Sequence, residues 1–355
     1  MNALRVETGT LIRLVTEIFE SVGLPRENAG IVADSLVSAD LEGVASHGVM
    51  LVPMYIARIK AGSVSVSRTP VVVEDHGALV VMSAGHSLGQ ISAHAAVDLG
   101  IQRARAHGVA AVAVREAFHF GAASYWARGF ARAGMIGFAF SNTRPLMPAP
   151  GGAERIVGNN PLSIAFPSTS GEPVVVDMAM SATAMGKIRL AEAQGRTIPE
   201  GWATDAQGRP TTSPTEAIKG MLLPAAGPKG FGLAVAIDLL CGALSGGSVG
   251  SAVQPLYAQF DRFYNCAHAF IAIDASRVRS GKGIGETVDT FAQTIRSSKQ
   301  ATGTDRIFAP GELERARRAE SAAGCSLLRE VIDEINGVAQ QSNLGSRLSP
   351  LNSER

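Results

Sequence analysis

The middle of the sequence alternates short apolar runs, typical of buried strands, with longer helical segments that each end at a glycine. The helical segments span residues 87–107 and 121–133, and the strand-like runs span residues 109–114 and 135–141. This alternation predicts an α/β domain, in which helices cover the faces of a sheet. Taken alone, it favours a doubly wound sheet.

Both ends of the chain have helical patterns. Apolar residues recur at helical spacing over residues 11–22, and residues 25–41 have the composition of a second helix. Near the other end, an apolar stripe that starts at Leu327 and Leu328 predicts a last helix. Residues 195–228 contain five prolines and are expected to form a turn-rich connection.

The composition excludes several classes of protein. Charged residues make up 18% of the chain and the formal net charge is +1, so neither nucleic acid nor a membrane surface is an expected partner. The low charged share indicates that much surface is buried between subunits. The three cysteines have no CxxC spacing, which predicts neither disulfides nor a metal site and fits the cytoplasm. The N-terminal segment does not have the pattern of a signal peptide.

Familiar nucleotide and nucleophile motifs are absent or misplaced. No GxGxxG run follows an early strand, and the nearest candidate, residues 281–285, has Glu286 where the last glycine belongs. Residues 246–250 match GxSxG, but they follow an apolar helix pattern instead of a strand. We therefore expect neither a Rossmann fingerprint nor a nucleophile elbow.

Short polar runs stand instead between the predicted elements, where ligands of α/β proteins usually bind. The first places His47 between Ser46 and Gly48, after a helical pattern ends. A histidine in such a place is most often a cap or packing residue, yet its pKa near neutrality also suits acid–base work. The later runs are residues 116–123, 142–145, 158–161, 177–181 and 228–232.

In their order along the chain, these runs resemble the malate/L-lactate dehydrogenase family of the second, non-Rossmann type. The matching stretches are DLEGVASHGV, HFGAA, GGAERIVGNNP, DMAMS, IPEGWATDAQGRPTTSP, GPKGFGLA and APGELE. The family includes ureidoglycolate, sulfolactate, diketogulonate and piperideine-2-carboxylate oxidoreductases. The resemblance extends from the first helical segment to the last.

The resemblance implies an α/β fold with a non-Rossmann cofactor-binding sheet and a helical domain built from both ends of the chain. Residues 1–68 and 305–340 would form the helical domain, and residues 69–304 the α/β domain that binds cofactor and substrate. Residues 341–355 would be a loose tail. The implied partners are NAD or NADP, a small 2-oxo or 2-hydroxy acid, and a second copy of the chain in a cytoplasmic homodimer.

The resemblance also assigns roles to residues. His47 would be the acid/base for the substrate oxygen, with Ser46 as its hydrogen-bonding neighbour, and His119 a second catalytic candidate. The expected cofactor-binding residues are His119, Phe120, Gly121, Ala122, Thr143, Asp177, Met178, Ala179, Lys229, Pro310, Gly311 and Glu312. The expected substrate-binding residues are Leu51, Asn159, Met185 and Gly186. A plain alternative for Asp177 is a helix N-cap, whereas Lys229 near a helix start opposes the helix dipole and favours a bound phosphate.

One departure from the family concerns the substrate. Leu51 occupies a position where the family commonly has an arginine that pairs with the substrate carboxylate, a contact that leucine cannot make. Another cation would then bind this group, or the substrate carries a different one. The candidate cations are Arg144, Lys187 and Arg189. Together with Met54 and Met185, Leu51 favours a bulkier or more apolar substrate than malate.

Three readings of the function follow. The first is NAD(P)-dependent transfer of a hydride between nicotinamide and a 2-hydroxy/2-oxo acid pair. Lys187, directly after Met185 and Gly186, supports it, because imine-reducing members tend to have an aspartate there. The second is NADPH-dependent reduction of a cyclic imino acid, and the third is a non-catalytic ligand-binding homologue. Arg144, Lys282 or Arg306 would supply the cation for a 2′-phosphate.

Overall fold

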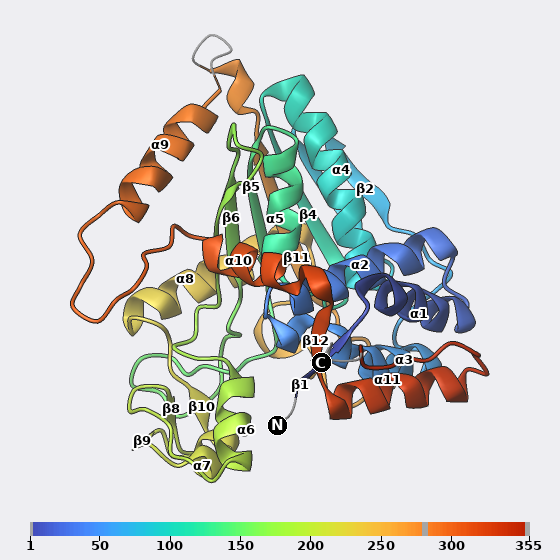
Figure 1. Ribbon diagram of the computed structural model, residues 1–355. Coiled ribbons are helices and arrows are strands. Elements are labelled where there is room, and N and C mark those ends of the chain that lie inside the picture. The colour runs from blue at the N-terminus through green and yellow to red at the C-terminus, as the bar shows by residue number, and fades with distance from the viewer. Residues whose placement is uncertain (1–2, 279–282, 352–355) are drawn as a thin grey trace.

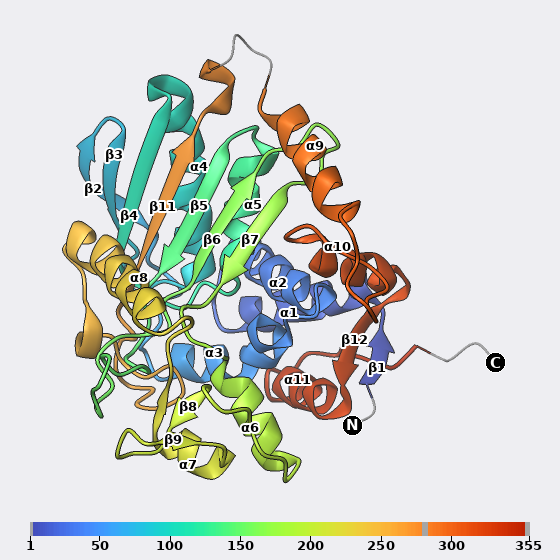
Figure 2. The ribbon, with the colours of Figure 1, turned by 90° about the vertical axis from the view of Figure 1, so that its left-hand side faces the viewer.

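The computed structural model describes residues 3–278 and 283–351, and within them seven strands form one mixed sheet. In sheet order, the strands are β2 (Val71–His76), β3 (Leu79–Ser83), β4 (Val109–Ala117), β11 (Cys266–Ile273), β5 (Ile136–Ser141), β6 (Leu162–Phe166) and β7 (Val174–Met178). Figure 2 shows this order across the sheet, from β2 to β7. The predicted α/β class is confirmed.

The sheet is not doubly wound, and the reason is the position of β11. This strand comes from late in the chain and lies between β4 and β5, antiparallel to both. Strands β3 and β4 pair in parallel, while the hairpins β2–β3, β5–β6 and β6–β7 are antiparallel. The local alternation of strand and helix was therefore right, whereas the topology that it favours by itself was wrong.

Helices cover both faces of the sheet. Helices α4 (Gly89–His107) and α5 (Ala123–Arg132) pack on one face, and α8 (Pro228–Asp238) lies on the other (Figure 2). Gly137 in β5 permits close contact with α5, because a Cβ atom there would lie 2.4 Å from Cβ of Phe130. The buried apolar side chains accordingly form two clusters, one on each side of the sheet.

The two ends of the chain meet beside the sheet, next to the α4 side (Figure 1). Their helices are α1 (Thr8–Ser21), α2 (Arg26–Leu41), α3 (Val52–Lys60) and α11 (Arg329–Gln341). Strand β1 (Ala3–Val6) pairs with β12 (Cys325–Leu328), so Leu327 and Leu328 belong to a strand and not to the last helix. The apolar stripe predicts a helix for these two leucines, but their strand forms because β12 pairs with β1 from the opposite end of the chain.

A small layer below the main sheet comes from residues 185–222 (Figure 1). It contains α6 (Met185–Ala193), α7 (Pro214–Lys219) and a sheet of β8 (Ala203–Thr204), β9 (Pro210–Thr211) and β10 (Met221–Leu222). The expected turn-rich connection thus includes short paired strands. The remaining helices are α9 (Gly285–Arg296) and α10 (Glu312–Glu320).

Two further features bear on the expectations. Beyond α11, residues 342–351 contain neither helix nor strand, but the side chain of Leu348 is only 4% exposed. Among the described residues, no helix combines the length and apolar character needed to cross a bilayer.

Candidate active site

Most of the polar runs lie where strands of the main sheet begin or end on one side, which is called the sheet edge below. Strand β11 begins at Cys266, opposite Ala117 at the end of β4, and His268 lies opposite Ser141 at the end of β5. At the same edge, Met178 at the end of β7 pairs with Leu162 at the start of β6. The segments that leave β4, β5 and β7 and that enter β6 and β11 are therefore neighbours in space.

The loop that carries His47 is held from behind by a buried carboxyl group. Oδ2 of Asp40, near the end of α2, accepts a hydrogen bond of 2.7 Å from the backbone N–H of Val49. Gly48 makes this contact possible, because a Cβ atom there would lie 2.1 Å from Oδ1 of Asp40. Burial raises the pKa of Asp40 to about 7. Between Asp40 and Val49, the chain forms a short 3-10 turn, Ala45–His47.

His47 and His119 face each other across this edge. Their rings stack with centroids 5.5 Å apart at an interplanar angle of 21°. Nδ1 of His47 lies 3.0 Å from Oγ of Ser46, and Nδ1 of His119 lies 2.7 Å from the hydroxyl of Tyr55. Gln90 donates a hydrogen bond of 3.2 Å to the same hydroxyl. Each ring is thus oriented through its Nδ1 atom.

Both histidines are favoured in the neutral form. Desolvation lowers the pKa of His47, and the carboxylate of Asp177 opposes this effect. The pKa of His119 lies well below its ordinary value because of desolvation and the nearby rings of His47 and His268. A pair of neutral imidazoles suits proton transfer near neutral pH.

Asp177 lies at the end of β7 and points to the start of α5. Its Oδ2 accepts a hydrogen bond of 3.1 Å from the backbone N–H of Ser124, in the first turn of α5. The protein's own carboxylate thus occupies this helix start, where exposed backbone N–H groups favour an anion. Desolvation raises the pKa of Asp177, although the residue keeps solvent-exposed surface.

The predicted cofactor-binding residues after β4 and β5 have different structural roles. Phe120 is buried and stacks on His268 with ring centroids 4.3 Å apart. Gly121 has a φ of +81°, a backbone conformation that favours glycine. Ala122 is the N-cap of α5. Past β5, Oγ1 of Thr143 donates a hydrogen bond of 3.0 Å to the side-chain oxygen of Asn159. Two predicted residues far apart in the sequence are thus in contact.

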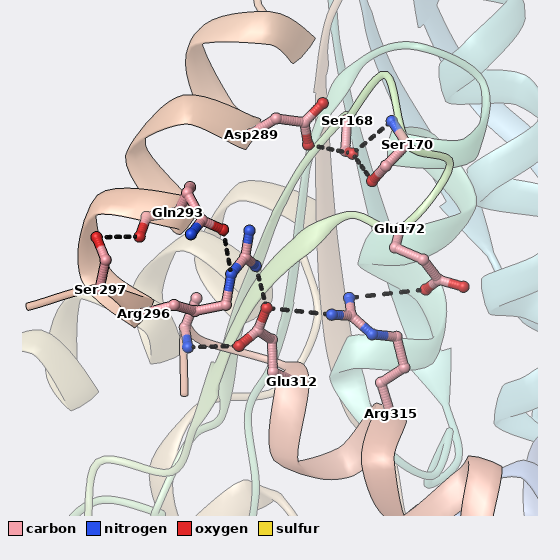
Figure 3. A network of polar contacts seen from close by, with 10 residues as sticks. Ser168, Ser170, Glu172, Asp289, Gln293, Arg296, Ser297, Glu312 and Arg315 are labelled. Atoms are coloured by element: carbon pink, nitrogen blue, oxygen red, sulfur yellow. Dashed lines mark hydrogen bonds and ion pairs between the residues drawn. The ribbon is translucent and has the colours of Figure 1, made fainter. Parts of the chain in front are cut away.

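Pro310, Gly311 and Glu312 pack against β7. The carbonyl of Pro310 accepts a hydrogen bond of 3.1 Å from Val175, and a Cβ atom on Gly311 would lie 3.0 Å from Cβ of Val175. The carboxylate of Glu312 is nearly buried and forms ion pairs with Arg296 of α9 and Arg315 of α10. In Figure 3, Glu312 lies at the centre of this network. Its ion pairs join α9 and α10 near the start of β7.

Lys229 lies in the first turn of α8. Its side chain is exposed, and within the described residues it has no hydrogen bond or ion pair. A cavity of about 290 Å³ adjoins this helix start and is lined by Gly227, Pro228 and the loop 148–153. An open helix start with a free lysine suits the phosphates of a dinucleotide.

The remaining predicted residues have varied surroundings. Met178 at the end of β7 is 45% exposed, and Ala179 follows it. Met185 and Gly186 form the first turn of α6, and a Cβ atom on Gly186 would meet open space.

Leu51 is 1% exposed and Met54 is 8% exposed, so the apolar character of these two residues serves the core. Of the three cations considered for a 2′-phosphate, the guanidinium of Arg306 stacks on Phe308 at 4.7 Å, and Lys282 lies outside the described residues. The described residues also contain no cluster of three side chains that could hold a metal ion.

Sequence reasoning missed Tyr55 and Gln90. Tyr55 lies in α3, eight residues after His47, and its contact with His119 spans 64 positions. A tyrosine within an apolar helix pattern resembles a core residue, and its ring does pack against Phe118 at 5.2 Å. The polar role of its hydroxyl becomes apparent only when β4 is brought beside α3.

Comparison with known proteins identifies the family. Residues 6–336 match the family described as malate/L-lactate dehydrogenase. A malate dehydrogenase of Pyrococcus abyssi is 33% identical over 96% of this chain and 95% of its own length. An L-sulfolactate dehydrogenase of Methanocaldococcus jannaschii is 35% identical over 94% of this chain and 95% of its own. The solved structure of a sulfolactate dehydrogenase from that organism superposes with a TM-score of 0.90 at 34% identity, over 96% of this chain and 98% of that one. By sequence and by fold, this chain belongs to the malate/L-lactate dehydrogenase family.

Proposed function

We propose that this oxidoreductase interconverts a 2-hydroxy acid and its 2-oxo acid at the His47–His119 site, by oxidation of the CH–OH group to a carbonyl or by the reverse reduction. The family makes the chain an oxidoreductase of hydroxy and oxo acids. Its relatives include dehydrogenases named for NAD(+) and for NADP(+), and the cofactor is NAD or NADP. The observation that carries the proposal is the pair of oriented, neutral histidines at the sheet edge.

In this proposal His47 moves the proton of the substrate oxygen. Ser46 bonds Nδ1 and leaves Nε2 for the substrate, and Asp177 favours the charged ring that forms when His47 accepts a proton. Tyr55 and Gln90 hold the ring of His119, which would contact the substrate or the cofactor from the opposite side. When bound, the nicotinamide supplies or accepts the hydride.

The residues present fit such a cofactor at two places. The cavity beside Lys229 and the start of α8 would hold phosphates, and the segment from Asp177 to Ala179 at the end of β7 borders the histidines. We propose that these groups, with Thr143 and residues 310–312, position the dinucleotide. The division into a helical domain and an α/β domain remains part of the same proposal.

Replacement of His47 by alanine tests the role of the histidine pair. We expect His47→Ala to lower kcat for reduction of the best 2-oxo acid by about 10²–10⁴-fold, because a general acid contributes in this range. Dissociation constants for NADH and NADPH should stay within about twofold of wild type if their contacts lie elsewhere. Steady-state kinetics at the reduced-nicotinamide band and fluorescence titration measure the two quantities.

The control is His107→Ala, at the exposed end of α4. This variant should match wild type in both assays. Activity of His47→Ala within about threefold of wild type would contradict the acid/base role.

Reduction of a cyclic imino acid is a second candidate. A solved δ1-piperideine-2-carboxylate reductase from Pseudomonas syringae superposes with a TM-score of 0.84 at 29% identity. Turnover of pyrroline-2-carboxylate in the same assay, beside malate, lactate and a panel of 2-oxo acids, separates the two candidates. Preference for the imine would replace the hydroxy-acid proposal.

We also propose a cytoplasmic homodimer. Three cysteines that are buried and unpaired fit a reducing compartment. On α8 and the π-helical turn after it, Leu233, Leu239 and Leu244 are 42%, 52% and 42% exposed, which is unusual for leucine on one stretch of surface. A second copy of the chain would cover them.

A further inference from the structure

Arg144 is a partly buried cation without a protein partner. It follows β5 at the sheet edge and is of intermediate exposure. Within the described residues its guanidinium has neither a hydrogen bond nor an ion pair. Nearby Arg155 differs, because its Nε donates a hydrogen bond of 2.9 Å to the carbonyl of Gly220. A guanidinium with five N–H donors and a reduced water shell needs an acceptor.

The charges around Arg144 are of its own sign. Desolvation lowers its pKa, and Arg155 and Arg189 lower the pKa further. Its other electrostatic neighbours are the hydroxyl groups of Tyr264 and Tyr257. No carboxylate of the described protein balances this group of positive charges. An anionic ligand would both pair with the guanidinium and offset the repulsion among the arginines.

Arg144 belongs to the same site as the histidines. Tyr257 interacts electrostatically with Arg144 and with Tyr55, and Tyr55 bonds His119. Tyr264 likewise interacts with Arg144 and with Tyr55. The hydrogen bonds of His268 show the same neighbourhood. One ring nitrogen lies 3.0 Å from Oγ of Ser141, three residues before Arg144, and the other lies 3.0 Å from the carbonyl of Phe118, directly before His119.

We propose that Arg144 binds the carboxylate of the 2-oxo or 2-hydroxy acid, and this inference rests on the function proposed above. An arginine can grip a carboxylate through two parallel hydrogen bonds, which orients the neighbouring carbon as well as holding it. The buried side chain of Leu51 is directed into the core and leaves this task to another group. Arg144 would thus set the preference for substrates with a carboxylate next to the reacting carbon.

The test measures binding of oxamate, a stable carboxylate analogue of 2-oxo acids, to the complexes with NADH and with NADPH. In Arg144→Met the dissociation constant of oxamate should rise at least about 10-fold, because a charge-assisted pair is lost. Arg144→Lys should bind with intermediate strength, since it keeps the charge but loses the fork. The affinities for NADH and NADPH should be unchanged. Arg196→Met, which removes an exposed arginine, is the matched control.

A second measurement separates a binding role from a structural one. Because Arg144 has no protein partner, Arg144→Met should melt at or above the temperature of wild type. A large fall in melting temperature would mean that the arginine supports the fold, and the proposal would be wrong. Unchanged oxamate affinity, loss of NADPH affinity alone, or a wild-type complex that does not bind oxamate would also overturn it.

The two proposals fail in different ways. If the wild-type protein reduces no 2-oxo acid but binds oxamate through Arg144, the reaction assignment fails and the carboxylate site stands. If it reduces 2-oxo acids and Arg144→Met retains both kcat/KM and oxamate affinity, the reaction stands and the role of Arg144 is refuted.

Discussion

At the scale of the residue, the site depends on side chains that hold other side chains. Ser46 holds His47, and Tyr55 with Gln90 holds His119. Asp40 holds the backbone of the His47 loop through Val49 and lies against Gly48. The reacting groups therefore keep their geometry through buried neighbours that touch no substrate.

Asp40 also makes stability depend on pH. Its pKa is raised from 3.8 to about 7 by burial, so the folded protein binds this proton more tightly than the unfolded chain. Stability linked to this group is complete below about pH 4 and is lost as the pH rises toward 7. Asp40→Asn, which can still accept from Val49, should remove this dependence. Between pH 5 and 8 wild type should lose about 2–4 kcal/mol relative to the variant.

Urea unfolding of both proteins at several pH values checks this expectation. Other titrating groups act equally on the two proteins, so the difference between them isolates Asp40. Parallel curves across this range would show that the Asp40 carboxyl titrates normally in the folded protein.

At the scale of the element, Arg58 joins α3 to the loop 255–262. All five N–H donors of this buried side chain are used: four bond the carbonyls of Pro255, Leu256, Ala258 and Arg262, and one bonds Ser63. The guanidinium also stacks on Phe260 at 5.1 Å. The loop carries Tyr257. Helix α3 therefore contributes Tyr55 directly and, through Arg58, holds the loop that contains Tyr257.

We expect Arg58→Met to lower the free energy of unfolding by about 3–5 kcal/mol, since four carbonyls lose a buried charged donor. Lys60→Met, in the same helix but exposed, should change it by less than about 0.5 kcal/mol. Chemical denaturation measures both values. A loss below about 1 kcal/mol in Arg58→Met would mean that water replaces the guanidinium.

The elements themselves were largely predictable. Residues 135–141 and 25–41 were placed to within one residue of β5 and α2, because apolar runs and helical patterns with flanking proline or glycine are local signals. Strands β1 and β12 were not, since each is short and gains its hydrogen bonds only from the other. The mixed sheet was likewise hidden, because β11 enters it from more than 120 residues beyond β5.

At the scale of the whole molecule, α8 and the turn after it expose apolar side chains that a second chain could bury. Exposed leucines on one stretch favour burial against another chain. Light scattering should give twice the chain mass of 36.8 kDa. The double variant Leu239→Asp/Leu244→Asp should shift the mass toward that of a single chain.

The comparison variant is Phe291→Asp, on α9, where the side chain is 66% exposed on another surface. It should keep the wild-type mass. A single-chain mass for wild type would refute the homodimer. An unchanged mass in the leucine variant would show that the contact between the two chains lies on another surface.

The sequence by itself determined the family, the α/β class and the polar runs that supply the chemistry, including Ser46, His47, His119 and Asp177. These are properties of order and spacing along the chain. Only the tertiary structure decided which runs meet. It placed β11 between β4 and β5, joined Tyr55 to His119, seated Asp177 on the start of α5, buried Leu51 and left Arg144 without a partner. Strand register, burial and the pairing of charges depend on residues far apart in sequence, and so they arise only when the chain has folded.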